Sequence, residues 1–228
     1  MLYSKRQMSD SFLIGMILAV VGGFLDAYTY VARGGVFANA QTGNIVLFGL
    51  NLAERKWLHA LSYFIPILAF ICGVFVDEWI KKYFLPKPKI HWRQIVLLFE
   101  ILVLFVVAML PLGGKNDLIA NVLVSFVCSM QVQSFRKVHG LPYATTMCTG
   151  NLRSGTEHLF RYTQSKDKMD WKKSLHYYGV ICFFIIGAGI GAVCTNRFGQ
   201  HTVAFCNILL LLVCALLSIR SIETEIHV

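Results

Sequence analysis

The sequence predicts an all-α membrane protein with six transmembrane helices and two shorter re-entrant half-helices. Three observations support this prediction. Of the 228 residues, 56% are hydrophobic and only 14% are charged, whereas a soluble domain has about 25% charged residues. Apolar runs close to the roughly 20 residues that cross a bilayer recur along the chain. A polar Thr-Gly-Asn tripeptide occurs twice within apolar surroundings, at 42–44 and 149–151.

Six apolar runs leave almost no room for a soluble domain, so residues 1–228 are expected to form a single integral membrane domain in the lipid bilayer. The first run follows Lys5 and Arg6 and is similar to a signal peptide. It continues for more than 20 residues without a cleavage site of small residues, so we expect it to be retained as the first span. The six predicted spans are 11–31, 57–76, 93–112, 118–135, 176–194 and 202–219.

Segments 36–52 and 143–161 are each long enough either to cross the membrane or to dip in and return. The distribution of Lys and Arg distinguishes the two arrangements, because cytoplasmic loops are enriched in these residues. If both segments return, fifteen Lys and Arg lie inside and five outside; if both cross, the numbers are eleven and nine. The sequence therefore favours six spans with both termini in the cytoplasm.

The two halves of the chain, about 11–112 and 118–219, show signs of an internal repeat. Gly34 matches Gly140 at an offset of 106, and after a one-residue gap the two Thr-Gly-Asn tripeptides align. At an offset of 114 the distinctive matches are Trp57, Tyr63 and Gly73 with Trp171, Tyr177 and Gly187. With three spans in each half, the second half must be inverted relative to the first.

Inverted repeats with short, glycine-interrupted segments at corresponding positions are typical of transporters and channels that bind their solute near the midplane. Irregular backbone survives at that depth only when it is buried in protein or lines a watery cavity. We expect one half-helix to begin at Ile45 and the other at Leu152, with their positive N-terminal ends facing each other. Their caps would be Thr42 or Asn44 and Thr149 or Asn151, while Gly43 and Gly150 allow the chain to turn.

A few further polar residues lie within the apolar runs. Asp26 is inside the first span, where a carboxylate is costly enough to suggest a function; the alternative is a structural Asp that caps the first half-helix. Gln133 occupies nearly the equivalent place in the second half. Arg153 either faces the solute or forms a structural pair with Glu157, four residues on along the same helix face. We predict a solute pathway formed by Asp26, Asn39, Thr42, Gly43, Asn44, Gln133, Thr149, Gly150, Asn151 and Arg153.

Other polar residues have more ordinary interpretations. Glu100 is either a proton relay or a snorkelling residue, and the sequence slightly favours snorkelling. Ser125, Ser129 and Gln131 are expected to form hydrogen bonds between helices. The seven cysteines fall in or beside apolar runs, without a CxxC pair or a histidine at ligand spacing. They are therefore predicted to be packing residues, with no metal site and no cofactor.

The stretch GGFLDAYTYVARGGVFANAQTGNIVLFG resembles the signature of the YoaK family of bacterial integral membrane proteins, a family of unknown function. The resemblance extends from Gly15 to about Ile219 and rests on the Gly-x-x-Asp-Ala, Phe-x-Ala-Asn and Thr-Gly-Asn elements. It implies a multi-pass inner-membrane protein and brings no substrate, cofactor or catalytic residue. One departure is Gln41, where the family more often has an apolar residue.

The sequence predicts a small secondary transporter or channel for a small anionic or neutral polar solute, with Asp26 as the candidate proton-coupling group. A membrane sensor or assembly scaffold without transport is the alternative. The sequence is also compatible with a homo-oligomer. An enzyme is not expected, because HExxH and GxSxG are absent and His158 and His176 have no evident serine partner. A nucleic-acid partner is not expected either, because the net charge of +9 comes from residues in short connections between spans.

Overall fold

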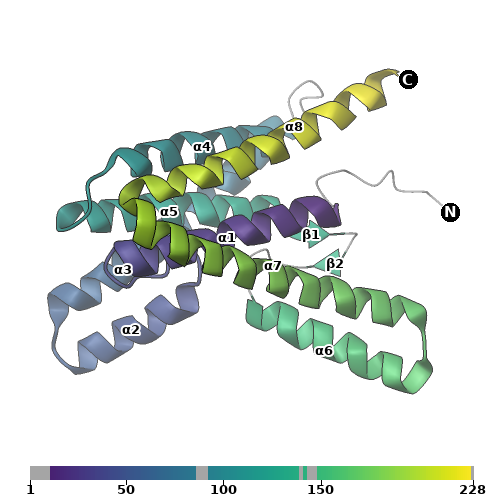
Figure 1. The fold of residues 1–228 in the computed structure, drawn as a ribbon, viewed down its shortest axis with the longest axis horizontal. Helices are drawn as coiled ribbons and strands as arrows, with labels where there is room; N and C mark the ends of the chain where they lie inside the picture. Colours follow the sequence, from purple (N-terminus) through teal and green to yellow (C-terminus); the bar gives the residue numbers. More distant parts are fainter. Residues whose placement is uncertain (1–10, 86–91, 139–140, 143–147, 227–228) are drawn as a thin grey trace.

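The computed structural model describes residues 11–85, 92–138, 141–142 and 148–226, and this part of the chain is almost entirely helical (Figure 1). A 3-10 turn, η2 (Gly199–Val203), precedes the last helix, and a short antiparallel pair, β1 (Lys137–Val138) with β2 (Leu141–Pro142), lies before α6. The helices are α1 (Phe12–Ala32), α2 (Gln41–Ala53), α3 (Trp57–Phe84), α4 (Trp92–Met109), α5 (Lys115–Ser134), α6 (Cys148–Ser165), α7 (Lys168–Phe198) and α8 (Ala204–Ile226).

The six predicted spans fall on α1, α3, α4, α5, α7 and α8. Four stretches are long and apolar enough to cross a membrane by length and composition alone: Phe12–Ala32, Trp57–Phe84, Trp92–Met109 and Lys168–Ser218, the last of which contains α7 and most of α8. α5 is not in this set, because its first turn contains Lys115 and Asp117 and its buried face carries several polar side chains. Both α3 and α7 extend well beyond the ends predicted from hydropathy.

The helices of the two polar segments, α2 with 13 residues and α6 with 18, differ from the rest in where they begin and are called the short helices below. Figure 1 shows that α2 and α6 start near the middle of the bundle and run outwards towards opposite ends. Each then folds back onto the next helix, so that α2 packs against α3 and α6 packs against α7. The predicted segment 36–52 corresponds to the loop before α2 and to α2 itself. Residues 143–147 of the predicted segment 143–161 lie outside the described residues.

Two helix pairs pack tightly, α1 with α7 and α3 with α5. Each pair combines one helix from the first half of the chain with one from the second half. Glycine makes both contacts close. A Cβ atom at Gly187 in α7 would lie 2.1 Å from the Val20 carbonyl oxygen in α1, and one at Gly73 in α3 would lie 2.3 Å from the Phe126 carbonyl oxygen in α5. No side chain fits at either position, so the backbones pack directly against each other.

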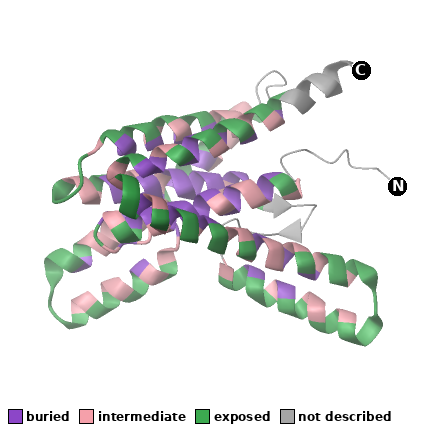
Figure 2. Cartoon of the chain, viewed as in Figure 1, coloured by how far each residue is buried: buried purple, intermediate pink, exposed green. Residues whose placement is uncertain are grey.

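The main apolar core lies between α1, α4, α5 and α8. Figure 2 shows the buried residues gathered along the middle of the bundle, whereas the outer faces and the tips of the two helical hairpins are exposed. Large apolar side chains cover those outer faces, among them Leu58, Phe75 and Trp79 of α3, which are 85%, 67% and 77% exposed. Such a surface suits contact with lipid, and the buried polar groups described next are the exceptions within the core.

Candidate functional site

Asp26 caps the first short helix from a neighbouring element. Its side chain is 4% exposed, and Oδ1 accepts hydrogen bonds from the backbone N–H groups of Asn39 (2.8 Å) and Ala40 (3.2 Å), immediately before α2. Both donors belong to residues that precede the first helical residue of α2, and a carboxylate at this place interacts favourably with the positive helix end. These contacts are those of the structural alternative for Asp26, although Oδ2 of the same carboxyl has no partner among the described residues.

Asn44 fixes the loop that leads into α2. Its Nδ2 donates to the Phe37 carbonyl (2.5 Å) and to Oε1 of Gln41 (2.9 Å), and its Oδ1 accepts from the Phe37 N–H (3.1 Å). Gly43 lies against the Phe37 ring, since a Cβ there would be 2.8 Å from Cδ2. The amide of Asn44 is therefore used in holding the loop, with little left for a solute.

The starting points predicted for the two short helices were wrong. α2 begins at Gln41 and α6 at Cys148, each about four residues earlier than expected. The backbone before Gln41 is held by Asp26 of α1, and both Thr-Gly-Asn tripeptides lie within the first turns of their helices. Within these turns Asn44 and Asn151 are buried, at 0% and 3% exposure. Three of the other predicted site residues, Thr42, Thr149 and Gly150, are exposed, and Gly43 is half-buried.

The beginning of α6 lies near the same carboxylate. The thiol of Cys148, the first residue of α6, interacts electrostatically with Asp26. In α5, Cys128 also interacts with Asp26. Asp26 is therefore close to the N-terminal ends of both short helices and to α5. The meeting of the two Thr-Gly-Asn segments themselves at Asp26 stays a prediction.

Several buried polar groups around α1 and α5 have no hydrogen-bond partner among the described residues. The most notable is Asn39, which is 4% exposed and whose Nδ2 and Oδ1 are both unpaired. Gln131 of α5 is completely buried, with both side-chain polar atoms unpaired. Buried polar groups without partners are rare because each costs about 1–3 kcal/mol. They are therefore candidates for contact with a ligand or with water.

One face of α5 lines this region with polar side chains. Asn121, Ser125 and Cys128 follow one another at helical spacing and are 0–2% exposed. Gln41 at the start of α2 donates to Ser125 (3.5 Å), which connects α2 with α5. Ser129 instead donates to a carbonyl of its own helix. Of the predicted bonds between helices, only that of Ser125 is therefore present in the described residues.

Two predicted site residues lie away from Asp26. Gln133 donates to the Glu78 carboxylate of α3. Arg153 has a side chain that is 79% exposed and forms an ion pair with Glu157 at 3.8 Å, as in the structural alternative. Both side chains therefore have partners of their own. Neither makes a contact with Asp26 among the interactions of the described residues.

Glu100 does not snorkel to the surface. Its side chain is completely buried in α4, and neither carboxyl oxygen has a hydrogen-bond partner in the described part of the chain. Snorkelling needs a position near the end of a helix, from which the head group can reach water. Glu100 instead lies midway along α4 and faces the core, so this interpretation was wrong.

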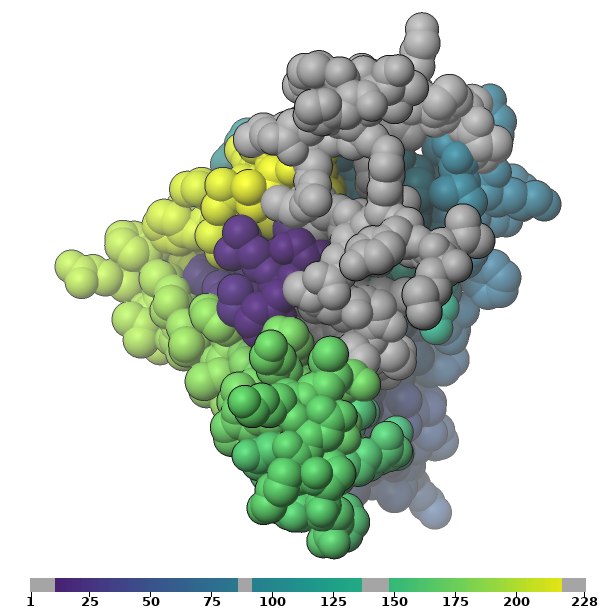
Figure 3. All heavy atoms as spheres, turned by 90° about the vertical axis from the view of Figure 1, so that its right-hand side faces the viewer, coloured from purple at the N-terminus to yellow at the C-terminus, as the bar shows by residue number. Residues whose placement is uncertain are grey.

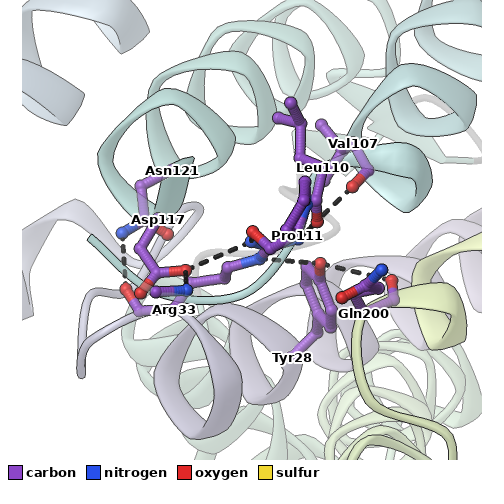
Figure 4. Close-up of polar contacts among 9 residues, drawn as sticks. Tyr28, Arg33, Val107, Leu110, Pro111, Asp117, Asn121 and Gln200 are labelled. Carbon is purple, nitrogen blue, oxygen red and sulfur yellow. Dashed lines mark hydrogen bonds and ion pairs between the residues drawn. The ribbon is translucent and has the colours of Figure 1, made fainter. Parts of the chain in front are cut away.

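The most extensive polar cluster was not predicted as a site. Arg33, at the end of α1, is completely buried. Figure 4 shows its guanidinium group surrounded by acceptors from other parts of the chain. Nη1 donates to the Pro111 carbonyl (2.7 Å) and to Asp117 Oδ1 (3.1 Å), and Nη2 donates to the carbonyls of Leu110 (2.7 Å) and Val107 (3.3 Å).

This arginine cluster closes one end of the bundle. Arg33 Nε donates to the Tyr28 hydroxyl (2.9 Å), which in turn donates to the Gln200 carbonyl in η2 (3.4 Å), and the Asn121 amide donates to the Arg33 carbonyl (2.7 Å). The cation thus neutralises the negative end of α4 and joins it to α1, α5 and η2. The count of Lys and Arg placed Arg33 among the five residues outside, as an ordinary loop residue. Only its position at the end of the first span could have indicated a structural role.

Apolar helices long enough to span a bilayer, packed around buried polar groups, define a multi-pass membrane protein. The chain belongs to the family described as "Protein of unknown function (DUF1275)", whose family model matches residues 14–216. It is similar to the UPF0700 transmembrane protein YoaK of Bacillus subtilis (strain 168), with 27% identity over 148 residues. This alignment covers 63% of the present chain and 64% of the relative, which is less than two thirds of its length. No solved structure matches the chain significantly.

Proposed function

We propose that this protein is a small secondary transporter or channel of the bacterial inner membrane for a small anionic or neutral polar solute. In this proposal six helices cross the bilayer, α2 and α6 are re-entrant half-helices, and the solute binds where their N-terminal ends approach Asp26. The observation that carries the proposal is the pair of unpaired groups at the start of α2: the Asn39 amide and Oδ2 of Asp26, both buried.

An inverted repeat is supported by the two glycine contacts. Gly187 and Gly73 are related by the offset of 114 found in the sequence, and the residues they touch, Val20 and Phe126, are related by the other offset, 106. The residues that form one helix contact are therefore related to those that form the other by the same two offsets that align the halves of the sequence. The opposite directions of α2 and α6 in Figure 1 are those that an inverted repeat requires.

The proposed orientation places the end at which α1 begins in the cytoplasm. Figure 3 views the molecule from that side, where the α6–α7 hairpin projects beside the start of α1. The tip of this hairpin carries exposed basic residues: Arg161, Lys166, Lys168 and Lys172. Positive charge on this side is typical of a cytoplasmic face.

The electrostatics of the site favour an anion or a polar neutral solute. Two helix N-termini contribute partial positive charge, and the unpaired amide of Asn39 offers both a donor and an acceptor. Asp26 opposes an anion when ionised and accommodates one when protonated, which would couple the solute to a proton. Because Asn44 is occupied by the loop and Arg153 by Glu157, we assign the main selectivity contact to Asn39.

A test can separate solute binding from folding. In Asn39→Ala the backbone N–H still bonds to Asp26, so stability should be nearly unchanged, whereas Asn44→Ala removes three loop bonds and should destabilise. A thermal-shift screen of inorganic anions, small carboxylates, amino acids and polyols should find a compound that stabilises the wild type and has at least tenfold weaker affinity for Asn39→Ala. Equal affinity for this variant would contradict the proposed site.

Transport itself needs a flux measurement. Purified protein in liposomes should move the selected compound, and a pH gradient should drive its accumulation in the wild type but not in Asp26→Asn. Arg153→Gln serves as the matched charge variant and should retain flux. Accumulation that ignores the pH gradient would rule out proton coupling.

A sensor or assembly scaffold is the second candidate function. The observation in its favour is the set of capping bonds made by Asp26, which is sufficient for a purely structural role. This candidate predicts no flux of any compound in the screen and a partner protein that co-purifies in a fixed ratio.

A further inference from the structure

A second acidic residue lies in the core, apart from the site at Asp26. Glu100 is on the face of α4 that also carries Leu97 and Leu104, which belong to the main apolar core and are completely buried. Its own side chain is 0% exposed, and Oε1 and Oε2 both lack a hydrogen-bond partner among the described residues. A structural carboxyl would have such partners, so the fold does not account for this one.

The neighbouring helices α5 and α8 bring thiols within electrostatic range of Glu100. Cys128 of α5 and Cys206 and Cys214 of α8 interact with it electrostatically, and no charged side chain of α3, η2 or any other described element does so. An ionised carboxylate without a partner is extremely unfavourable in an apolar core. In this conformation the Glu100 carboxyl must therefore be neutral, and it holds a proton.

Asp77 provides a useful contrast. It is equally buried, but its Oδ1 accepts a hydrogen bond from the Ser134 hydroxyl (2.5 Å). Lys81 and Arg93 also act on it electrostatically. One oxygen of the Asp77 carboxyl therefore has a hydrogen-bond partner, while its Oδ2 has none among the described residues; neither oxygen of Glu100 has one.

Cys128 connects the two core acids, because its thiol interacts with both Asp26 and Glu100. α5 packs against both α1, which carries Asp26, and α4, which carries Glu100. We propose that Glu100 is a second proton-binding site, which releases its proton to the Asp26 carboxylate or to water when the transport cycle opens this side of α5. Only the O–H bond of the Glu100 carboxyl breaks, and the proton forms a new O–H bond on its acceptor. This inference rests on the proposed transport function.

Infrared spectroscopy tests the bound proton without any solute. The wild-type protein in lipid nanodiscs at neutral pH should show a C=O stretching band of a neutral carboxylic acid that disappears in Glu100→Gln and persists in Asp77→Asn. Glu100→Asp should retain the band at a shifted frequency, which provides a second variant if the first folds poorly. A Glu100→Gln spectrum identical to that of the wild type would overturn the inference.

Flux measurements test the role of this proton in transport. With the compound selected by the screen, the accumulation driven by a pH gradient should be at least tenfold lower in Glu100→Gln than in the wild type. The variant should retain exchange of labelled for unlabelled compound, which needs no net proton release. Unchanged accumulation in Glu100→Gln would overturn the inference while leaving the proposed function intact. Absence of flux in the wild type would instead overturn the proposed function, and with it the role of Glu100 in transport.

Discussion

Replacing Arg33 tests the arginine cluster as the main polar clamp of the bundle. Arg33→Met would leave the carbonyls of Leu110 and Pro111 and the Asp117 carboxylate without their cationic donor, at distances that are now 2.7–3.1 Å. Breaking a buried ion pair costs about 3–5 kcal/mol, and each unsatisfied buried acceptor about 1–3 kcal/mol. Because Asp117 is 21% exposed, water can solvate part of the loss. We therefore expect Arg33→Met to lower the free energy of unfolding by about 3–5 kcal/mol.

The measurement is unfolding in mixed micelles titrated with a denaturing detergent. Arg33→Lys keeps the charge, but an ammonium group cannot reach all the acceptors that the guanidinium group bonds. Its free energy of unfolding should therefore fall by an intermediate amount, about 1–3 kcal/mol. Arg197→Met is the matched control, because Arg197 is an exposed arginine near a helix end. It should change stability by less than about 0.5 kcal/mol. A loss in Arg33→Met as small as that of the control would refute the clamp.

Three other predictions concern packing, capping and orientation. Gly187→Ala should destabilise the protein by about 1–3 kcal/mol, because the new Cβ would lie 2.1 Å from a carbonyl oxygen of α1. Gly189→Ala should not destabilise it, because there is open space around Gly189. Equal unfolding midpoints for the two variants would contradict the close contact. Asp26→Ala should cost about 0.5–2 kcal/mol through loss of the α2 cap, measured in the same titration. In a cysteine-free background, an impermeant thiol reagent should label Lys56→Cys in intact cells and Leu85→Cys only after permeabilisation; the reverse pattern would invert the proposed topology.

Much of the helical framework could be predicted, because a bilayer-length apolar run is a strong signal in any sequence. All six predicted spans fall on helices of 18 residues or more, and the two polar segments fall on α2 and α6, of 13 and 18 residues. Helix ends were less predictable. α7 begins before its apolar run where α6 packs along it, and α3 continues past its run where Asp77 and Glu78 bond to Ser134 and Gln133 of α5. Hydropathy does not report such contacts.

The candidate site was predicted at the level of segments more than of individual residues. The tripeptide pattern indicated the segments that become α2 and α6, and Asp26 is hydrogen-bonded to the backbone just before α2. The pattern could not reveal that Thr42 faces outwards while Asn39, five residues after Gly34, is buried, since that depends on where α2 begins. Arg33 was missed for a related reason: its acceptors are backbone carbonyls more than 70 residues away, and carbonyls leave no trace in a sequence.

The contact between α1 and α7 has a consequence for synthesis of the protein. Val20 and Gly187 are separated by 167 residues (187 − 20). At about 5–20 residues per second, the ribosome needs roughly 8–33 s to make the intervening chain. The bonds from Asp26 to the backbone before α2 span only 13 and 14 residues and can form early, whereas the face of α1 that α7 covers waits until α7 has been made. A chain truncated before α7 therefore displays an uncovered strip of backbone and small residues within the membrane, a surface by which quality control could recognise it as unfinished.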